Sequence, residues 1–178
     1  MKINTISNII ITVCVLAFSD SRVFAGDQAE NAESADTSSD WEENMDNDSV
    51  QFAANKALAR RWFEEVINQR NLDAIADIYS PDYIYHGPEG MEMRGLEAAR
   101  KFAASILKAS NDRKAIVDQQ VAEGDLVVTR FISRGHHTGT FQGKEPTGKM
   151  RITEGIDISR IKDGKILEDW EVIHTSDH

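Results

Sequence analysis

Residues 158–178 read ISRIKDGKILEDWEVIHTSDH, two β-patterned runs joined by Lys162-Asp163-Gly164. Alternating apolar and polar residues on both sides of a glycine-containing turn predict a β-hairpin. Strands usually avoid acids, because a buried carboxylate must be desolvated and one at an edge repels its neighbours. Both strands nevertheless carry acids, among them Glu168, Asp169 and Glu171 in this stretch and Asp157 just before it. Acids in this setting make the hairpin the first candidate for a functional site.

The length of the turn decides which acids lie together, because side chains alternate across a strand. A three-residue turn (162–164) whose glycine is left-handed places odd-numbered positions opposite one another. Asp157, Asp169 and Glu171 then share one face of the hairpin. A two-residue turn (163–164) would instead separate Asp157 from Glu171. The type of turn therefore discriminates between two arrangements of the candidate site.

The other face of the hairpin is apolar around Ile156, Trp170 and Val172, and two acids, Glu154 and Glu168, interrupt it. If this face lined a cavity, Glu154 and Glu168 would replace the first pair as site acids, with Trp170 between them. If it faced outward, it would pack against helices or a second subunit. Both registers stay open at the level of sequence.

The remaining elements follow from periodicity and turn residues. Helical spacing precedes a change to a period of two after residue 111, which predicts an α+β domain with a run of antiparallel strands. Gly135 and Gly155 are candidate bend points in the longer strands. The predicted helices are 52–68, 71–80 and 95–109, and Asn71 is the predicted cap of the second. The predicted strands are 83–86, 116–122, 126–137, 150–161 and 166–175.

The N-terminal residues 1–25 have the features of a secretory signal, with a lysine near the start and small residues before the cleavage position. The alternative is an uncleaved anchor, but the apolar run at 9–18 is short for a membrane span. We therefore expect a periplasmic or secreted protein without a stable membrane span. Cys14 is the only cysteine, so the mature chain would have neither a disulfide nor a thiolate metal ligand.

Residues 26–50 are rich in Asp and Glu and contain no Lys or Arg. Such a segment buries too little apolar surface to offset ordering entropy, so it is predicted to be a disordered acidic spacer. It carries most of the formal net charge of -10. The folded domain is then 51–178, whose nearly balanced charge contains no basic patch for nucleic acid.

Three stretches carry a resemblance to a known family: SPDYIYHGP at 80–88, HTGTFQGKEPTGK at 137–149 and RIKDGKILEDWE at 160–171. With the element order ααβαββββ, they make the chain similar to the SnoaL-like polyketide (ester) cyclases of the nuclear transport factor 2-like superfamily. The resemblance implies a cone-shaped curved antiparallel β-sheet packed with three N-terminal helices around a largely apolar pocket. It also implies chemistry without a cofactor or a metal.

The resemblance further implies which residues act. In these cyclases an acid on the last strand does acid-base work in an intramolecular aldol closure, and this position falls on Glu171. A polar partner three residues before the hairpin arginine falls on Asp157. Glu171 stands where the cyclases have Asp, and Asp157 stands where the polyketide enzyme has His. His86, which follows Tyr85 on the first strand, is placed at the pocket mouth.

Chemistry and geometry agree with these roles. A pocket carboxylate suits proton transfer beside a carbonyl, because burial lifts its pKa toward working pH. Two close acids lose their protons at different pH values, so one can be charged while the other is protonated. Glu171 is the candidate base and Asp157 the protonated donor. His86 and Tyr85 would orient the carbonyl.

Trp62 and His137 are candidate pocket walls. His136 and His137 point to opposite faces of a strand, so no metal site is expected.

The expected function is thus a cofactor-independent ester cyclase or isomerase acting on a hydrophobic, carbonyl-containing small molecule. Two alternatives remain: a non-catalytic periplasmic ligand-binding or accessory protein of the same fold, and a hydratase or epoxide hydrolase. The last would need an arginine bridging two carboxylates, for which Arg151 is the candidate. A homodimer formed through the sheet is expected.

Overall fold

A computed structural model describes residues 37–178, with side chains described from residue 47 onward. The predicted signal peptide, residues 1–25, and the first part of the predicted spacer, residues 26–36, lie outside the described residues. Within the described part, no helix is both long enough and apolar enough to cross a membrane.

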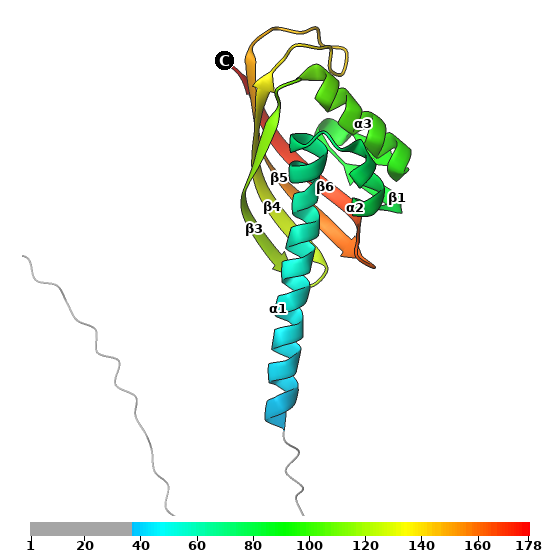
Figure 1. The fold of residues 1–178 in the computed structure, drawn as a ribbon, viewed down its shortest axis with the longest axis vertical. Helices are drawn as coiled ribbons and strands as arrows, with labels where there is room; N and C mark the ends of the chain where they lie inside the picture. The colour runs from blue at the N-terminus through cyan, green and yellow to red at the C-terminus, as the bar shows by residue number, and fades with distance from the viewer. Residues whose placement is uncertain (1–36) are drawn as a thin grey trace, which may run out of the picture. The chain divides into compact units, whose positions relative to one another are not determined.

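The helices follow the predicted order, but the first is longer than expected. Helix α1 spans Thr37–Arg61 and continues as a π-helical segment, η1 (Trp62–Asn68). Residues 37–50, placed in the acidic spacer by composition, are therefore helical, and this part of α1 extends beyond the sheet (Figure 1). The remaining helical elements are η2 (Leu72–Ala74), α2 (Ile75–Ile78), η3 (Pro88–Gly90) and α3 (Gly95–Ala109).

The start of the second helical region is capped as its sequence predicts. The side-chain oxygen of Asn71 accepts a hydrogen bond from the backbone N–H of Asp73 at 3.1 Å. This bond satisfies one of the donors left free in a first helical turn. The same region ends where Tyr79 adopts an extended conformation and begins a strand.

One six-stranded sheet has the order β2-β1-β6-β5-β4-β3. It is mixed rather than wholly antiparallel, because β1 pairs with β6 in parallel. The short strand β2 is absent from the sequence prediction, since three residues are too few for a periodic signal. The strands are β1 (Tyr79–His86), β2 (Glu92–Arg94), β3 (Lys114–Glu123), β4 (Leu126–His136), β5 (Met150–Lys162) and β6 (Lys165–Asp177).

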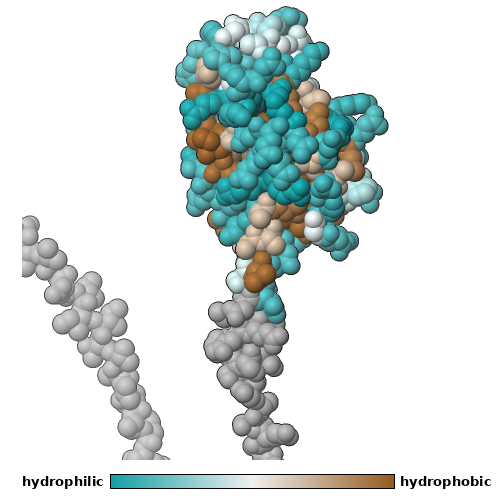
Figure 2. Space-filling model, viewed as in Figure 1, coloured by the Kyte–Doolittle hydropathy of each residue, from teal (hydrophilic) through white to brown (hydrophobic). Residues whose placement is uncertain are grey.

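The sheet curves, and α2, α3 and the C-terminal part of α1 cover one of its faces (Figure 1). The core lies between this inner face and the helices, where Val66, Ile75, Ile78, Val127 and Ile166 are almost completely buried. The surface on the side viewed in Figure 2 is mostly hydrophilic, with hydrophobic patches among the polar side chains. These features confirm the predicted α+β architecture.

The turn between β5 and β6 is the two-residue alternative. Lys162 pairs directly with Lys165, and both turn residues have positive φ, 51° at Asp163 and 70° at Gly164. Two positive φ values define a type I′ turn, the two-residue hairpin that matches the twist of the strands. A regular hairpin with this turn would separate Asp157 from Glu171.

A bulge in β6 reverses the consequence of this shorter turn. Ile161 pairs with Ile166, but the next pair is Arg160 with Glu168, so Leu167 is an extra residue. One extra residue shifts the alternation by one position. Beyond the bulge, odd-numbered positions again lie opposite one another, and the candidate acids share a face as expected.

Candidate active site

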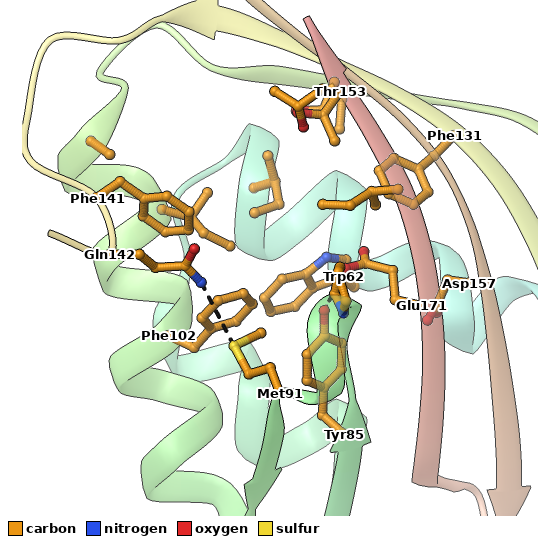
Figure 3. Close-up of a pocket in the computed structure, with 18 of the residues that line it drawn as sticks. Trp62, Tyr85, Met91, Phe102, Phe131, Phe141, Gln142, Thr153, Asp157 and Glu171 are labelled. Atoms are coloured by element: carbon orange, nitrogen blue, oxygen red, sulfur yellow. Dashed lines mark hydrogen bonds between the residues drawn. The ribbon is translucent and has the colours of Figure 1, made fainter. Parts of the chain in front are cut away.

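A cavity of about 950 Å³ lies between the inner face of the sheet and the helices. Aromatic side chains from α3, η1 and β1 form much of its wall, while Asp157 and Glu171 project from the sheet (Figure 3). At the mouth, the Gln142 side chain donates to the Met91 sulfur at 3.6 Å, which links the 137–149 loop to the segment before β2. The combination of an apolar wall and a few convergent polar groups is typical of a small-molecule site.

Three carboxylates gather at one end of this cavity, and we call them the acid cluster: Asp157, Asp169 and Glu171. Asp157 pairs directly with Glu171 across β5 and β6, and Asp169 pairs with Ser159 in the next inward position. Asp169 is only 3% exposed. Alternation places all three on the inner face of the sheet, so the geometry matches the odd-numbered register.

Tyrosines from β1 hold two of the three acids. The Tyr83 hydroxyl donates to Asp169 Oδ2 at 2.8 Å, and the Tyr85 hydroxyl donates to Glu171 Oε2. The third acid, Asp157, accepts a hydrogen bond from the Ser159 hydroxyl at 3.1 Å. The parallel pairing of β1 with β6 positions both tyrosines beside the acids, because Tyr85 pairs with Asp169.

Burial dominates the electrostatics of the acid cluster. Desolvation, with the charges of Asp169 and Glu171, raises the pKa of Asp157 well above its usual value. Desolvation raises the pKa of Asp169 to about 7. It also raises the pKa of Glu171, although the hydrogen bond from Tyr85 opposes this change. Close carboxyls cannot all ionise together, so the cluster holds at least one proton near neutral pH.

His86, Glu168 and Trp170 lie on the outer face of the sheet and do not line the cavity. His86 Nε2 is 2.8 Å from Glu168 Oε1, and its ring stacks on Trp170 at a centroid distance of 5.5 Å. Arg160 completes this group, with its guanidinium carbon 5.2 Å from the Trp170 centroid. The predicted contact of His86 with a substrate carbonyl is therefore wrong, because residue 86 faces away from the acid cluster.

The alternative register with Glu154 and Glu168 as site acids is also excluded. Glu154 is exposed, and Glu168 pairs with His86 and Arg160 on the outer face. The arginine bridge that a hydratase would need is not formed either. Arg151 lines the cavity, but it binds Asp177 at 2.8 Å and 3.1 Å, six positions along β5 from Asp157.

The other predicted wall residues do line the cavity. Trp62, Tyr85 and His137 belong to its lining. His137 is 2% exposed, and neither of its ring nitrogens has a hydrogen-bond partner. Among the side chains of residues 47–178, no group of three or more His, Asp or Glu has an arrangement suited to a metal ion.

Polar side chains outside the predicted site residues also line the cavity, among them Tyr83, Arg113 and Asp169. Alternation had placed Asp169 on the correct face, and the same pattern could have identified it as a site acid. Alternation could also have identified Tyr83, because it lies two positions before Tyr85 in the predicted strand 83–86 and therefore shares its face. Arg113 precedes β3, and no local pattern indicates where its side chain points.

Comparison with known proteins identifies the family of the chain. The model of the SnoaL-like polyketide cyclases matches residues 57–177, about two thirds of the chain. The chain belongs to the SnoaL-like polyketide cyclase family. Its matched region contains every element from the end of α1 to β6, and therefore the whole acid cluster. No curated protein matches the chain.

Solved structures agree with membership of this SnoaL-like family. AclR from Streptomyces galilaeus, a proposed hydroxylase, is 31% identical, with a TM-score of 0.61 over 69% of this chain and 76% of that one. IdmH from Streptomyces antibioticus, a proposed polyketide cyclase, is 27% identical, with a TM-score of 0.58 over 67% and 91% of the two chains.

A third structure supports the fold alone. A proposed SnoaL-like polyketide cyclase from Jannaschia sp. CCS1 is 22% identical, with a TM-score of 0.63 over 68% of this chain and 85% of that one. The names of these three proteins include both cyclases and a hydroxylase. The shared fold therefore leaves the reaction to be argued from the site.

Proposed function

We propose that this SnoaL-like protein is a cofactor-independent cyclase or isomerase that moves protons on a hydrophobic, carbonyl-containing small molecule. The observation that supports it is the acid cluster at the end of an apolar cavity: three carboxyls with raised pKa, of which Asp169 is buried and the other two are half-buried. Carboxyls in such a setting are poised to exchange protons at working pH.

Glu171 is the proposed base. Unlike Asp157, it accepts a hydrogen bond from a tyrosine, and that bond favours its charged form. Removal of a proton from the carbon beside a carbonyl needs a carboxylate in an apolar setting, where the attacking oxygens are not covered by water. Glu171 lies at the cavity surface beside the Tyr85 hydroxyl, which is suitably placed to orient a carbonyl oxygen.

Asp157 is the proposed acid. Desolvation and the charges of Asp169 and Glu171 raise its pKa well above the usual value, which favours its protonated form. Glu171 would take the proton from carbon, and the resulting enolate carbon would attack a second carbonyl of the same molecule. The new alkoxide would then take the proton of Asp157, and Glu171 would return its proton to Asp157. The product is an isomer of the substrate, with no change in oxidation state.

The test is hydrogen exchange on a probe ketone. We expect the protein to accelerate exchange of the α-hydrogens of 2-decanone in D₂O, followed by ¹H NMR. Glu171→Gln should lower this rate at least a hundredfold, since general-base catalysis typically contributes about 10²–10⁴-fold. Glu168→Gln is the matched control, because this acid lies on the same strand but faces outward; it should retain the rate.

The same experiment separates catalysis from the non-catalytic alternative. If 2-decanone binds, as judged by NMR shift changes of the cavity residues, but its exchange is not accelerated, the protein is a ligand-binding module. If Glu171→Gln loses binding and exchange together, the residue has a structural role.

We also propose that the protein acts as a homodimer and is exported. The outer face of the sheet exposes large apolar side chains, among them Ile156 at 47% and Val172 at 75%, and a second copy would cover them.

Export is proposed from the signal-like sequence of residues 1–25. Its test is the amount of protein in the periplasmic and cytosolic fractions, measured for the full chain and for a chain shortened at its N-terminus.

A further inference from the structure

The end of the cavity opposite the acid cluster carries positive charge. Arg113, His137 and Arg151 all line it there, and we call these residues the basic end. The Arg113 guanidinium donates from Nη1 to the Ser133 hydroxyl at 2.8 Å, while its Nε is buried without a partner. Within residues 47–178, Arg113 forms no ion pair with a carboxylate. A partly buried guanidinium with unused donors favours an anion beside it.

His137 adds a second unsatisfied group at the same end. Its backbone is paired, since its N–H donates to Lys149 O at 2.9 Å and its carbonyl accepts from Gly148 N at 2.9 Å. Its imidazole is buried at 2% exposure, yet neither ring nitrogen has a partner. A buried imidazole always has at least one N–H to donate, and leaving it unpaired is costly. A ligand oxygen in the cavity would satisfy it.

The charge balance of the basic end indicates how much negative charge it accepts. Arg151 is already compensated by Asp177 through two hydrogen bonds. Burial, with the nearby charge of Arg151, lowers the pKa of Arg113 from its ordinary value, although a guanidinium stays charged in proteins. One positive charge is therefore left without a counter-charge. A single carboxylate matches it, and the arginine fork fits the two oxygens of a carboxylate.

The two ends of the cavity lie in successive layers of the inner sheet face. Asp157 and Arg151 are six positions apart on β5, which is roughly 20 Å along a strand. Between these two ends, the layer next to the acids has no polar side chains and is formed by Phe131, Gly155 and Ile173. From the acid cluster outward, the paired layers are Thr129–Asp157–Glu171, Phe131–Gly155–Ile173, Ser133–Thr153–Thr175 and Gly135–Arg151–Asp177.

We propose that the basic end binds a carboxylate, and that the natural ligand is an elongated acid with an apolar middle and a carbonyl at its other end. Arg113 and His137 would anchor the carboxylate, and the apolar layer would hold the middle of the chain. The acid cluster would repel the carboxylate and so fix the direction of binding. The part of this proposal that concerns the carbonyl rests on the proposed function, whereas the carboxylate site does not.

Binding of matched probes tests the carboxylate site. Dodecanoate and 1-dodecanol share one chain length and differ in the head group, and each is titrated into the full protein by calorimetry near neutral pH. We expect dodecanoate to bind at least about tenfold more tightly, the usual gain from a charge-assisted pair of hydrogen bonds. Equal affinities would overturn the proposal. Tighter binding of dodecyl phosphate than of dodecanoate would also overturn it, because the site would then prefer a dianion.

Variants locate the effect. Arg113→Gln should remove about tenfold of the affinity for dodecanoate and leave that for 1-dodecanol unchanged, while Arg113→Lys should restore part of the preference. The matched control is Arg134→Gln, an exposed arginine on the same sheet whose position in β4 faces outward; it should change neither affinity. An unchanged affinity for 1-dodecanol would also show that the Arg113→Gln protein is folded.

Two outcomes for Arg113→Gln would count against the site. If the variant loses both ligands equally, Arg113 has a structural role and the carboxylate site is wrong. If it keeps the full preference for dodecanoate, the anion is bound elsewhere. Neither result depends on the exchange of 2-decanone, so a protein that binds dodecanoate selectively but fails the exchange test would retain this site and lose the proposed catalysis.

Discussion

Asp157 of β5 and Glu171 of β6 lie directly opposite each other on the inner face of the sheet. This pairing depends on two features of the hairpin together, its two-residue turn and the extra Leu167 in β6. Either feature without the other would turn the acids of β6 to the other face, because one residue of slip exchanges the faces of a strand. Together they cancel, and both carboxyls reach the cavity.

The acid cluster should make the protein less stable as the pH rises. The pKa of Asp169 is raised from its usual 3.8 to about 7 in the folded state. The folded protein therefore binds this proton more tightly than the unfolded chain, and stability is lost as the pH rises from 3.8 to about 7. We expect Asp169→Asn to flatten this slope and to stabilise the protein above pH 7 by on the order of 4 kcal/mol.

Urea unfolding at a series of pH values measures this slope. The amide oxygen of Asn can still accept the hydrogen bond from Tyr83, so the change isolates the titration. Asp118→Asn, at an exposed position paired with Arg130, is the matched control and should leave the slope intact. A wild-type stability that does not fall over this pH range would contradict the assigned burial of Asp169.

Tyr85→Phe should shift the pH dependence of catalysis. The Tyr85 hydroxyl opposes the rise in the pKa of Glu171, so its removal lets that pKa rise further. Less Glu171 is then ionised at a given pH, and the acid limb of the exchange rate moves toward higher pH, by about one unit for a hydrogen bond to a charged group. The pH profile of 2-decanone exchange measures this shift.

Tyr83→Phe serves as the comparison for Tyr85→Phe, because Tyr83 donates to Asp169 and not to Glu171. It should leave the acid limb closer to its wild-type position. A Tyr85→Phe profile that overlays the wild type would mean that Glu171 is not the base.

Gly155→Ala should narrow the middle of the cavity. A Cβ at this position would lie 2.7 Å from Phe131 Cζ and 2.8 Å from Ile173 Cγ2, so both side chains must shift. We expect several-fold weaker binding of dodecanoate by calorimetry and a loss of about 1–2 kcal/mol in stability. Glu154→Ala, at the neighbouring outward position, should leave binding unchanged; unaltered binding by Gly155→Ala would place the ligand elsewhere.

Val172→Asp should convert a dimer to a monomer. Val172 is the most exposed large apolar side chain on the outer face of the sheet, and a charge there cannot be buried in an interface without a partner. Light scattering coupled to size exclusion should show the mass fall by half, with unchanged stability. Lys101→Asp on α3 is the charge control. A wild-type protein of monomeric mass would rule out the dimer.

Much of the fold follows from local patterns. The four long strands and α3 were predicted nearly to their ends, because strong alternation and helical spacing are local properties of the chain. Asn71 was recognised as a cap for the same reason. The strand β2 and the parallel pairing of β1 with β6 were not predicted, since contacts between distant segments produce no periodic pattern in the sequence.

The sequence by itself determined that Asp157, Asp169 and Glu171 lie on the two strands of one hairpin. It also determined that Asp169 and Glu171 share a face, because alternation is a property of each strand alone. Only the tertiary structure decided that their face looks inward, since this depends on the bulge at Leu167 and on which side the helices cover. The tertiary structure also turned His86 to the outer face and brought Arg113 and His137 to the far end of the cavity. Residues this distant in the chain meet only when the sheet curves around a common interior.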